Sequence, residues 1–392
     1  MKTDRKNKKE SQQSEAVLVL QGGGSLGAYE CGVYKKLYEH GIKFDILAGS
    51  SIGAINASII CSAQNANKDA AEVLEKFWLT ISEDTALSPL SILFLSLSSF
   101  SSQLSSDKMM AIISSMYSTI FGNPKAFLPR WFKPTSPDYY LPPSKWNYLY
   151  DSAPLKKTLK EFIDFKYLKQ TDTQTEDKEE QSRLIITSTD IQKGEPVIFD
   201  SEKMDIDIDK IISCVGYPFY GITWSQDNGR YLWDGSLLTN TPMLDVIHAS
   251  PRYDKEFYIV DVFPRQQKEI PTNMIEVWHR ARDIIFMDKT DKNVQMLANF
   301  EKYLSLLKKI NTIINAEDAQ IDEKTRAKLK ELEPEYYELA QSRGAIVKDL
   351  TRIGRRERMH FLLEDADFSN YRIKKLIEEG EDDAERTLNK NG

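Results

Sequence analysis

The feature that most constrains the fold is an apolar run that passes directly into three glycines and then into a helix-forming stretch. Residues Ala16 to Leu37 read AVLVLQGGGSLGAYECGVYKKL. The first five residues have the composition of a buried β-strand, and an amphipathic helical pattern follows the glycines. Glycines at such a turn let the backbone approach a ligand closely, and the helix N-terminus offers unpaired N–H groups. The stretch therefore predicts a strand–turn–helix unit that can hold an anion.

The nature of that anion stays open from this stretch alone. Gly22, Gly24 and Gly27 match the dinucleotide fingerprint GxGxxG. The same amides suit the oxyanion of an ester hydrolysis intermediate, and a tight turn with no ligand is a third interpretation. A dinucleotide site needs an acidic residue at the end of the second strand, whereas Asp45 stands at the start of that strand. This position favours the oxyanion over the dinucleotide.

A second strand-to-helix turn follows the next apolar run. FDILAGS predicts a strand and GSSIGAINA continues into a helix, so that Gly49, Ser51 and Gly53 form the motif GxSxG. This motif is typical of a nucleophile elbow, in which a strained turn exposes the serine oxygen at the N-terminus of a helix. The alternative is a glycine-rich turn in which Ser51 only caps the helix. We take Ser51 as the candidate nucleophile, because Ser50 does not stand between the two glycines.

A carboxylate, rather than a histidine, is the predicted partner of Ser51. LWDGS ends a predicted strand at Asp234, and Gly235 lets the chain turn sharply. A partly desolvated carboxylate can accept the hydroxyl proton directly, although Asp234 could also only cap the next turn. Three further aspartates follow apolar runs and are weaker candidates: Asp190, Asp200 and Asp261. None of the four histidines follows a predicted strand, where a triad histidine normally stands: His40, His248, His279 and His360.

Strand and helix patterns alternate over most of the chain, which predicts an α/β domain with a largely parallel sheet. We divide the sequence into a disordered polar tail at 1–14, a catalytic domain at 15–265 and a helical C-terminal extension at 266–392. Residues 84–150, inside the catalytic domain, are rich in serine, proline and aromatic side chains. We interpret them either as a lid over an apolar site or as core helices with a rigid connection.

Composition excludes several classes of function. A net charge of -7 gives no basic field for nucleic acid. No stretch has the pattern of a signal peptide, and no apolar run approaches the ~18 residues that cross a bilayer. We therefore expect a cytoplasmic protein with peripheral contact to membranes. The three cysteines form no CxxC pair and stand in apolar contexts, which indicates free thiols: Cys31, Cys61 and Cys214.

Taken in order, GGGSLG, GSSIG, WDGS and LLTNTPM resemble the motifs of the patatin-like phospholipase family. ISCVGYPFYGI is similar to the segment that precedes the aspartate in that family. The resemblance covers about Ala16 to Pro264. It implies a three-layer α/β/α fold with a largely parallel central sheet. The remainder resembles the helical C-terminal region of a bacterial branch of the family.

By position, the resemblance assigns Ser51 as the nucleophile and Asp234 as its base, in a Ser–Asp dyad. It assigns the oxyanion hole to Gly22, Gly23 and Gly24. The implied activity is hydrolysis of fatty acyl esters at a lipid or membrane surface, through an acyl-enzyme and with no metal or other cofactor. Many members have Arg or Lys at the position of Leu26, and Gly or Ala at that of Ser236. The motifs also contain four supporting glycines: Gly27, Gly49, Gly53 and Gly235.

Three other functions stay open at this point. They are a non-lipid serine esterase or thioesterase, an inactive lipid-binding scaffold that acts through its C-terminal helices, and a dinucleotide enzyme. The sequence indicates no nucleic-acid partner, and it leaves the oligomeric state open. The C-terminal helices are the candidate region for self-association. Neither the lipid head group nor the ester position follows from the motifs.

Overall fold

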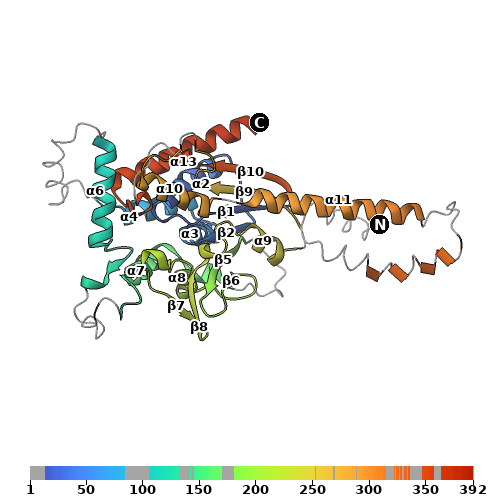
Figure 1. The fold of residues 1–392 in the computed structure, drawn as a ribbon, viewed down its shortest axis with the longest axis horizontal. Coiled ribbons are helices and arrows are strands. Elements are labelled where there is room, and N and C mark those ends of the chain that lie inside the picture. The colour runs from blue at the N-terminus through green and yellow to red at the C-terminus, as the bar shows by residue number, and fades with distance from the viewer. Residues whose placement is uncertain are drawn as a thin grey trace.

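The structure is a computed structural model that describes residues 14–83, 106–132, 145–169, 181–251, 253–267, 270–287, 289–314, 347–356 and 363–391, with a few single positions between them. Its centre is a sheet of eight described strands in the order β10-β9-β1-β2-β5-β8-β7, with β6 also paired to β5 (Figure 1). The predicted polar tail lies outside the described residues except for Ser14, which begins β1. Residues 84–105 of the predicted insertion also lie outside them.

Most of the sheet is parallel, as the alternating pattern predicts. Parallel pairing joins five strands: β1 (Ser14–Leu20), β2 (Ile46–Ser50), β5 (Arg183–Asp190), β9 (Asp254–Asp261) and β10 (Val347–Gly354). Three strands pair antiparallel at one side: β6 (Glu195–Asp200), β7 (Ser225–Asp227) and β8 (Arg230–Asp234). A separate two-stranded sheet joins β3 (Leu128–Pro129) to β4 (Tyr150–Asp151). Strands β5 and β6 form a hairpin.

Helices cover both faces of the sheet, which gives three layers. Strand β1 sends Leu18 and Leu20 into one apolar core, and Val17 and Val19 into the other. The first core contains residues of α2 (Gly27–Glu39), α3 (Ile52–Asn65), α4 (Ala70–Ile81), α7 (Ala153–Phe162), α8 (Ile208–Ser213) and α13 (Asn370–Asn391). The second contains residues of α9 (Met243–Ala249) and the N-terminal part of α11 (Thr290–Ile314), whose remainder projects from the body (Figure 1). Phe286 of α10 (Met274–Phe286) also belongs to the first core, and α6 (Ser106–Phe121) is a further described helix.

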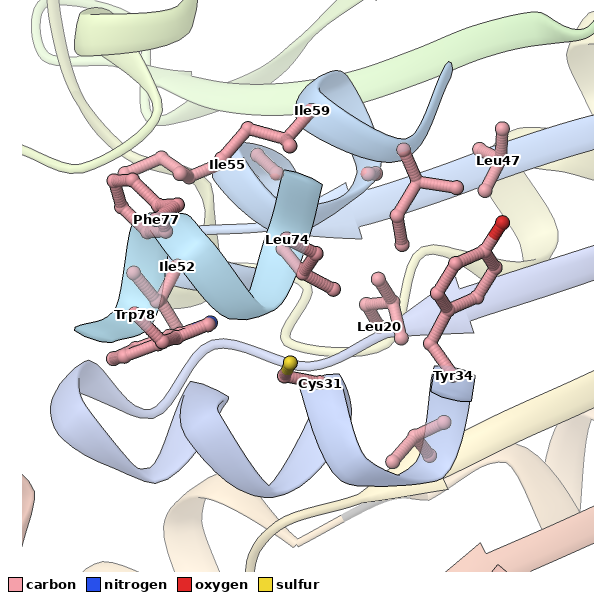
Figure 2. Close-up of a cluster of buried hydrophobic side chains, with 14 of the residues drawn as sticks. Leu20, Cys31, Tyr34, Leu47, Ile52, Ile55, Ile59, Leu74, Phe77 and Trp78 are labelled. Atoms are coloured by element: carbon pink, nitrogen blue, oxygen red, sulfur yellow. The ribbon is translucent and has the colours of Figure 1, made fainter. Parts of the chain in front are cut away.

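The first core holds α2, α3 and α4 against the strands that lead to the two predicted turns. Figure 2 shows Leu20 at the end of β1 close to Cys31 and Leu74, and Trp78 beside Ile52. All of these side chains are buried. The packing fixes the directions in which β1 and β2 pass into their helices. The three cysteines are buried free thiols, as predicted: Cys31, Cys61 and Cys214.

The C-terminal region is mainly helical, as expected, but it also adds a strand that the sequence analysis does not anticipate. Strand β10 pairs parallel with β9 at the edge of the sheet. Its exposed and half-buried residues outnumber its buried ones, so no apolar run marks it in the sequence. Helix α13 packs on α2 with the two backbones in contact. A Cβ on Gly32 would lie 1.9 Å from the carbonyl oxygen of Ile377, and one on Gly380 would lie 2.1 Å from that of Tyr29.

None of the described helices is both long enough and apolar enough to cross a bilayer.

The predicted start of α9 differs slightly from the one observed. The sequence predicts Pro242 as its first helical residue, whereas the helix begins at Met243 with Pro242 at the N-cap. Since the φ of proline suits either position, the pattern does not resolve this difference.

Candidate active site

Ser51 occupies a strained turn between β2 and α3. Its φ of 54° and ψ of -127° lie in a region of backbone conformation that residues other than glycine rarely adopt. The turn requires backbone contact on both sides of the serine. A Cβ on Gly49 would lie 2.2 Å from the carbonyl oxygen of Gly53, and one on Gly53 would lie 2.4 Å from that of Leu20. The two glycines of GxSxG are therefore required by packing, and Ser51 has the backbone geometry of a nucleophile elbow.

Strand β5 brings Asp234 to this serine across 183 residues of sequence. Consecutive residues of β5 pair with the two motifs, since Thr187 pairs with Ser50 of β2 and Ser188 pairs with Asp234 of β8. The Ser51 hydroxyl donates a hydrogen bond of 2.5 Å to Oδ2 of Asp234. Because β8 runs antiparallel to β5, this meeting depends on register and not on two parallel strands ending at one edge.

Burial sets the charge properties of Asp234. The residue has no exposed surface, and this burial raises the pKa of its carboxyl group from 3.8 to about 6. Hydrogen bonds oppose the rise: Oδ1 accepts from the N–H of Ser236 at 2.8 Å and from its hydroxyl at 2.7 Å. At neutral pH the carboxyl group is mostly ionised and can accept a proton. Ser236 thus contributes two hydrogen bonds to this carboxyl group.

The glycine turn after β1 lies against Ser51. A Cβ on Gly22 would lie 2.7 Å from Cβ of Ser51, and Gly24 has a φ of 58°. The N–H of Gly22 donates to Oδ1 of Asn240 at 2.9 Å, so this donor is already engaged. Gly23 and Gly24 stand at the start of the 3₁₀ turn η1 (Gly24–Leu26), which leads into α2. An oxyanion at this turn would therefore depend on the amides of Gly23 and Gly24.

Asn240 and Gln21 fix the glycine turn, and the sequence analysis assigned no role to either. Asn240 accepts from Gly22, and its amide donates to the carbonyl oxygen of Phe286 at 2.9 Å. Gln21 donates to the hydroxyl of Thr241 at 2.8 Å and accepts from the N–H of Val262 at 3.0 Å. The segment LLTNTPM thus anchors the turn after β1. Its motif was visible in the sequence, but its contact with the glycines depends on the fold.

An apolar cavity of about 340 Å³ begins beside the glycine turn and the elbow, at Gly24 and Ile52. Its wall includes Phe77 from α4 and Leu155 from α7. Described residues of the 84–150 segment line it as well: Thr119, Ala126, Phe127, Leu149 and Tyr150. Such a cavity can hold a hydrocarbon chain close to the Ser51 hydroxyl.

The weaker carboxylate candidates have other partners. Asp190 accepts from the N–H groups of Gln192 and Lys193 in the turn after β5. Asp200 binds the guanidinium of Arg183 at 2.6 Å. Asp261 lies 3.7 Å from both Arg265 and Arg352, and Asp45 accepts from the N–H of Ala16, at the far end of β1 from the glycine turn. The position of Asp45 argues against a dinucleotide site.

The described histidines also lie apart from the dyad. His40 pairs with Glu385 on the surface, and His248 is exposed near the end of α9. His279 is buried beside Asp283 and Glu364. His360 lies outside the described residues.

Comparison with known proteins gives matches of several kinds. Triacylglycerol lipase ptl3 from Schizosaccharomyces pombe (strain 972 / ATCC 24843) is 42% identical over 57 residues. That match covers 14% of this chain and 11% of the relative, so it spans only a small part of the lipase. Among solved structures, VipD from Legionella pneumophila is 11% identical with a TM-score of 0.36, over 97% of this chain and 67% of VipD. ExoU in its complex with SpcU from Pseudomonas aeruginosa is 14% identical with a TM-score of 0.26, over 82% of this chain and 66% of that one.

The match to a family model assigns the chain to a protein family. A family model described as "Patatin-like phospholipase" matches residues 18–247, a range that includes the glycine turn, the elbow and Asp234. This range is more than half of the chain. The chain belongs to the patatin-like phospholipase family.

Proposed function

We propose that the chain is a lipid acyl hydrolase of the phospholipase A type that acts through a dyad of Ser51 and Asp234. The Ser51 oxygen attacks the carbonyl carbon of a fatty acyl ester while Asp234 takes the hydroxyl proton. The ester C–O bond then breaks, and Asp234 returns the proton to the departing alcohol. A water molecule, deprotonated by Asp234, then attacks the acyl carbon. The bond to the Ser51 oxygen breaks, Asp234 returns the proton to Ser51, and the fatty acid leaves. The 2.5 Å hydrogen bond between the two side chains carries this proposal.

In this mechanism the negative charge of the tetrahedral intermediate lies at the glycine turn. The amides of Gly23 and Gly24 are the proposed donors, since Asn240 already engages the N–H of Gly22. The N-termini of η1 and α3 add favourable partial positive charge at the same place. One such donor contributes about 10²-fold or more in rate. The rigid anchoring by Asn240 supports this role, because donors that are already oriented need no rearrangement during the reaction.

Because the cavity is lined mainly by apolar side chains, we expect the part of the substrate beside Ser51 to be an acyl chain rather than a polar group. The function is tested with a panel of a short p-nitrophenyl ester, long-chain phosphatidylcholine, triacylglycerol and an acyl thioester. We expect fatty acid release from the phospholipid, and loss of that release in Ser51→Ala. Turnover of the thioester alone would instead assign a thioesterase. No Ser51-dependent turnover of any substrate would contradict the proposal.

The pH dependence of kcat/KM is a further prediction. Since Asp234 must be ionised to accept the proton, and burial raises its pKa to about 6, activity should fall as the pH drops through about 6. An ordinary aspartate would lose activity only near pH ~4. The measurement is the rate of short-ester hydrolysis between about pH 4 and pH 8, with circular dichroism to exclude acid unfolding. A constant rate down to about pH 4.5 in the folded protein would exclude Asp234 as the base.

A further inference from the structure

Helix α10 exposes an apolar face, while its charged side chains are buried or half-buried. Each exposed residue in the described part of this helix is apolar: Met274, Val277, Trp278, Ala281, Ile284 and Ile285. Trp278 keeps 68% of its surface exposed, and Ile285 keeps 63%. A helix at the surface of a globular protein normally has the opposite arrangement. An exposed apolar face of this size marks a contact with a partner or a membrane.

Ion pairs on the inner face hold α10 in this orientation. Arg282 lies 3.1 Å from Glu364 and 3.4 Å from Asp365, and Arg355 lies 2.7 Å from the same Glu364 oxygen. His279 is buried in this cluster. Turning the helix to bury its apolar face would separate these buried charges from their partners, which is costly in a low-dielectric interior. The outward position of the apolar face is therefore fixed by the fold.

This face lies next to the wall of the acyl cavity. The ring of Phe286, at the end of α10, is 5.6 Å from that of Tyr217, which is 5.7 Å from that of Phe219. Phe219 lines the cavity and is also 81% exposed. The carbonyl oxygen of Phe286 accepts from Asn240, which binds the glycine turn. Ring contacts through the buried Phe286 and the half-buried Tyr217 thus link α10 to Phe219 at the cavity.

We propose that the outer face of α10, together with Phe219, docks the protein on a lipid surface. Trp278, Ile284 and Ile285 would enter the boundary between head groups and acyl chains, where tryptophan is favoured. We assign a lipid surface as the occupant, because Phe219 is exposed, is linked to α10 by ring contacts and forms part of the wall of the cavity that would take the acyl chain. The assignment rests on the proposed function, in which a lipid is the substrate. Docking itself needs no catalysis and can be measured separately.

The test uses the full chain with Ser51→Ala, so that no lipid is hydrolysed, and vesicles of phosphatidylcholine. Trp278→Glu and Ile285→Glu should each lower the ratio of vesicle-bound to free protein about 10-fold or more. Trp278→Phe should retain binding. The matched controls are Tyr303→Glu and Ile313→Glu on α11, whose side chains are 65% and 69% exposed, and they should bind as before. Circular dichroism and the Tm establish that each variant is folded.

Equal binding by the α10 variants and their parent would overturn the proposal, and so would an absence of vesicle binding by the parent. Size-exclusion chromatography without vesicles gives a further outcome. If Trp278→Glu converts a dimer into a monomer, a second copy of the chain covers the face, and lipid docking is wrong. The proposed function is judged independently from turnover of the soluble short ester by the unsubstituted protein. Docking without turnover would overturn the hydrolase and leave the docking surface intact.

Discussion

Asp234→Asn should lower kcat by about 10³- to 10⁴-fold and at the same time stabilise the folded protein. The amide cannot accept the Ser51 proton, but it can occupy the same space. Its carbonyl can accept from Ser236, and its NH₂ group can donate to Ser51. The gain in stability follows from the sign of the pKa change. Burial raises the pKa of Asp234 from 3.8 to about 6, so ionisation at neutral pH costs the folded state up to about 3 kcal/mol, which the neutral amide avoids.

The measurements are the rate of short-ester hydrolysis and the free energy of unfolding at neutral pH. Because Asn followed by Gly235 can deamidate back to aspartate, the mass of the variant is checked and Asp234→Ala is measured beside it. Asp190→Asn is the matched control, since Asp190 is also buried at the end of a strand but bonds only to a turn. Near-normal activity in intact Asp234→Asn would refute the role of this residue as base.

Gly53→Ala should disrupt the fold itself. A methyl group at this position would lie 2.4 Å from the carbonyl oxygen of Leu20 and 2.6 Å from that of Gln21, and neither is a flexible side chain. To make room, α3 must move away from β1, which also displaces Ser51 from the glycine turn. We expect a loss of about 3 kcal/mol or more in unfolding free energy and a Tm lower by about 5 °C or more.

The control for this substitution is Gly354→Ala, at the end of β10. There the added methyl group would make only ordinary contact, 3.7 Å from Cβ of Asp261. Thermal unfolding followed by circular dichroism compares the two variants, and ester hydrolysis measures the displacement of Ser51. A Gly53→Ala protein with unchanged Tm and activity would show that the elbow tolerates separation of α3 from β1.

The two turns were predictable from sequence because their signals are local. An apolar strand, closely spaced glycines and a helix pattern lie within about ten residues at both Gly22 and Ser51. The parallel sheet followed from the alternation of strands and helices, and the family model confirms the resemblance on which the fold class rested. The candidate pair of Ser51 and Asp234 came from motif order. Its catalytic role stays a proposal until it is measured.

Other features depend on contacts between distant parts of the chain, which no local pattern contains. The register that pairs Ser188 with Asp234 is one of them. Strand β10 is another, because as an edge strand with charged residues it has no continuous apolar run. In the sequence, Gly32 resembles an ordinary helical glycine, and nothing local indicates its contact with α13. The pattern of α10 is misleading in a different way, since its apolar face would normally be assigned to the core.

The central claim is that Ser51 is the nucleophile and that Asp234 activates it. The most direct measurement is the rate and site of labelling by a fluorophosphonate probe, followed by mass spectrometry of the digested protein. We predict a single covalent adduct on the Ser51 peptide, no adduct in Ser51→Ala, and labelling that is at least about 10²-fold slower in Asp234→Asn. An adduct on another residue, or equally fast labelling of Ser51 without the carboxylate, would contradict this account.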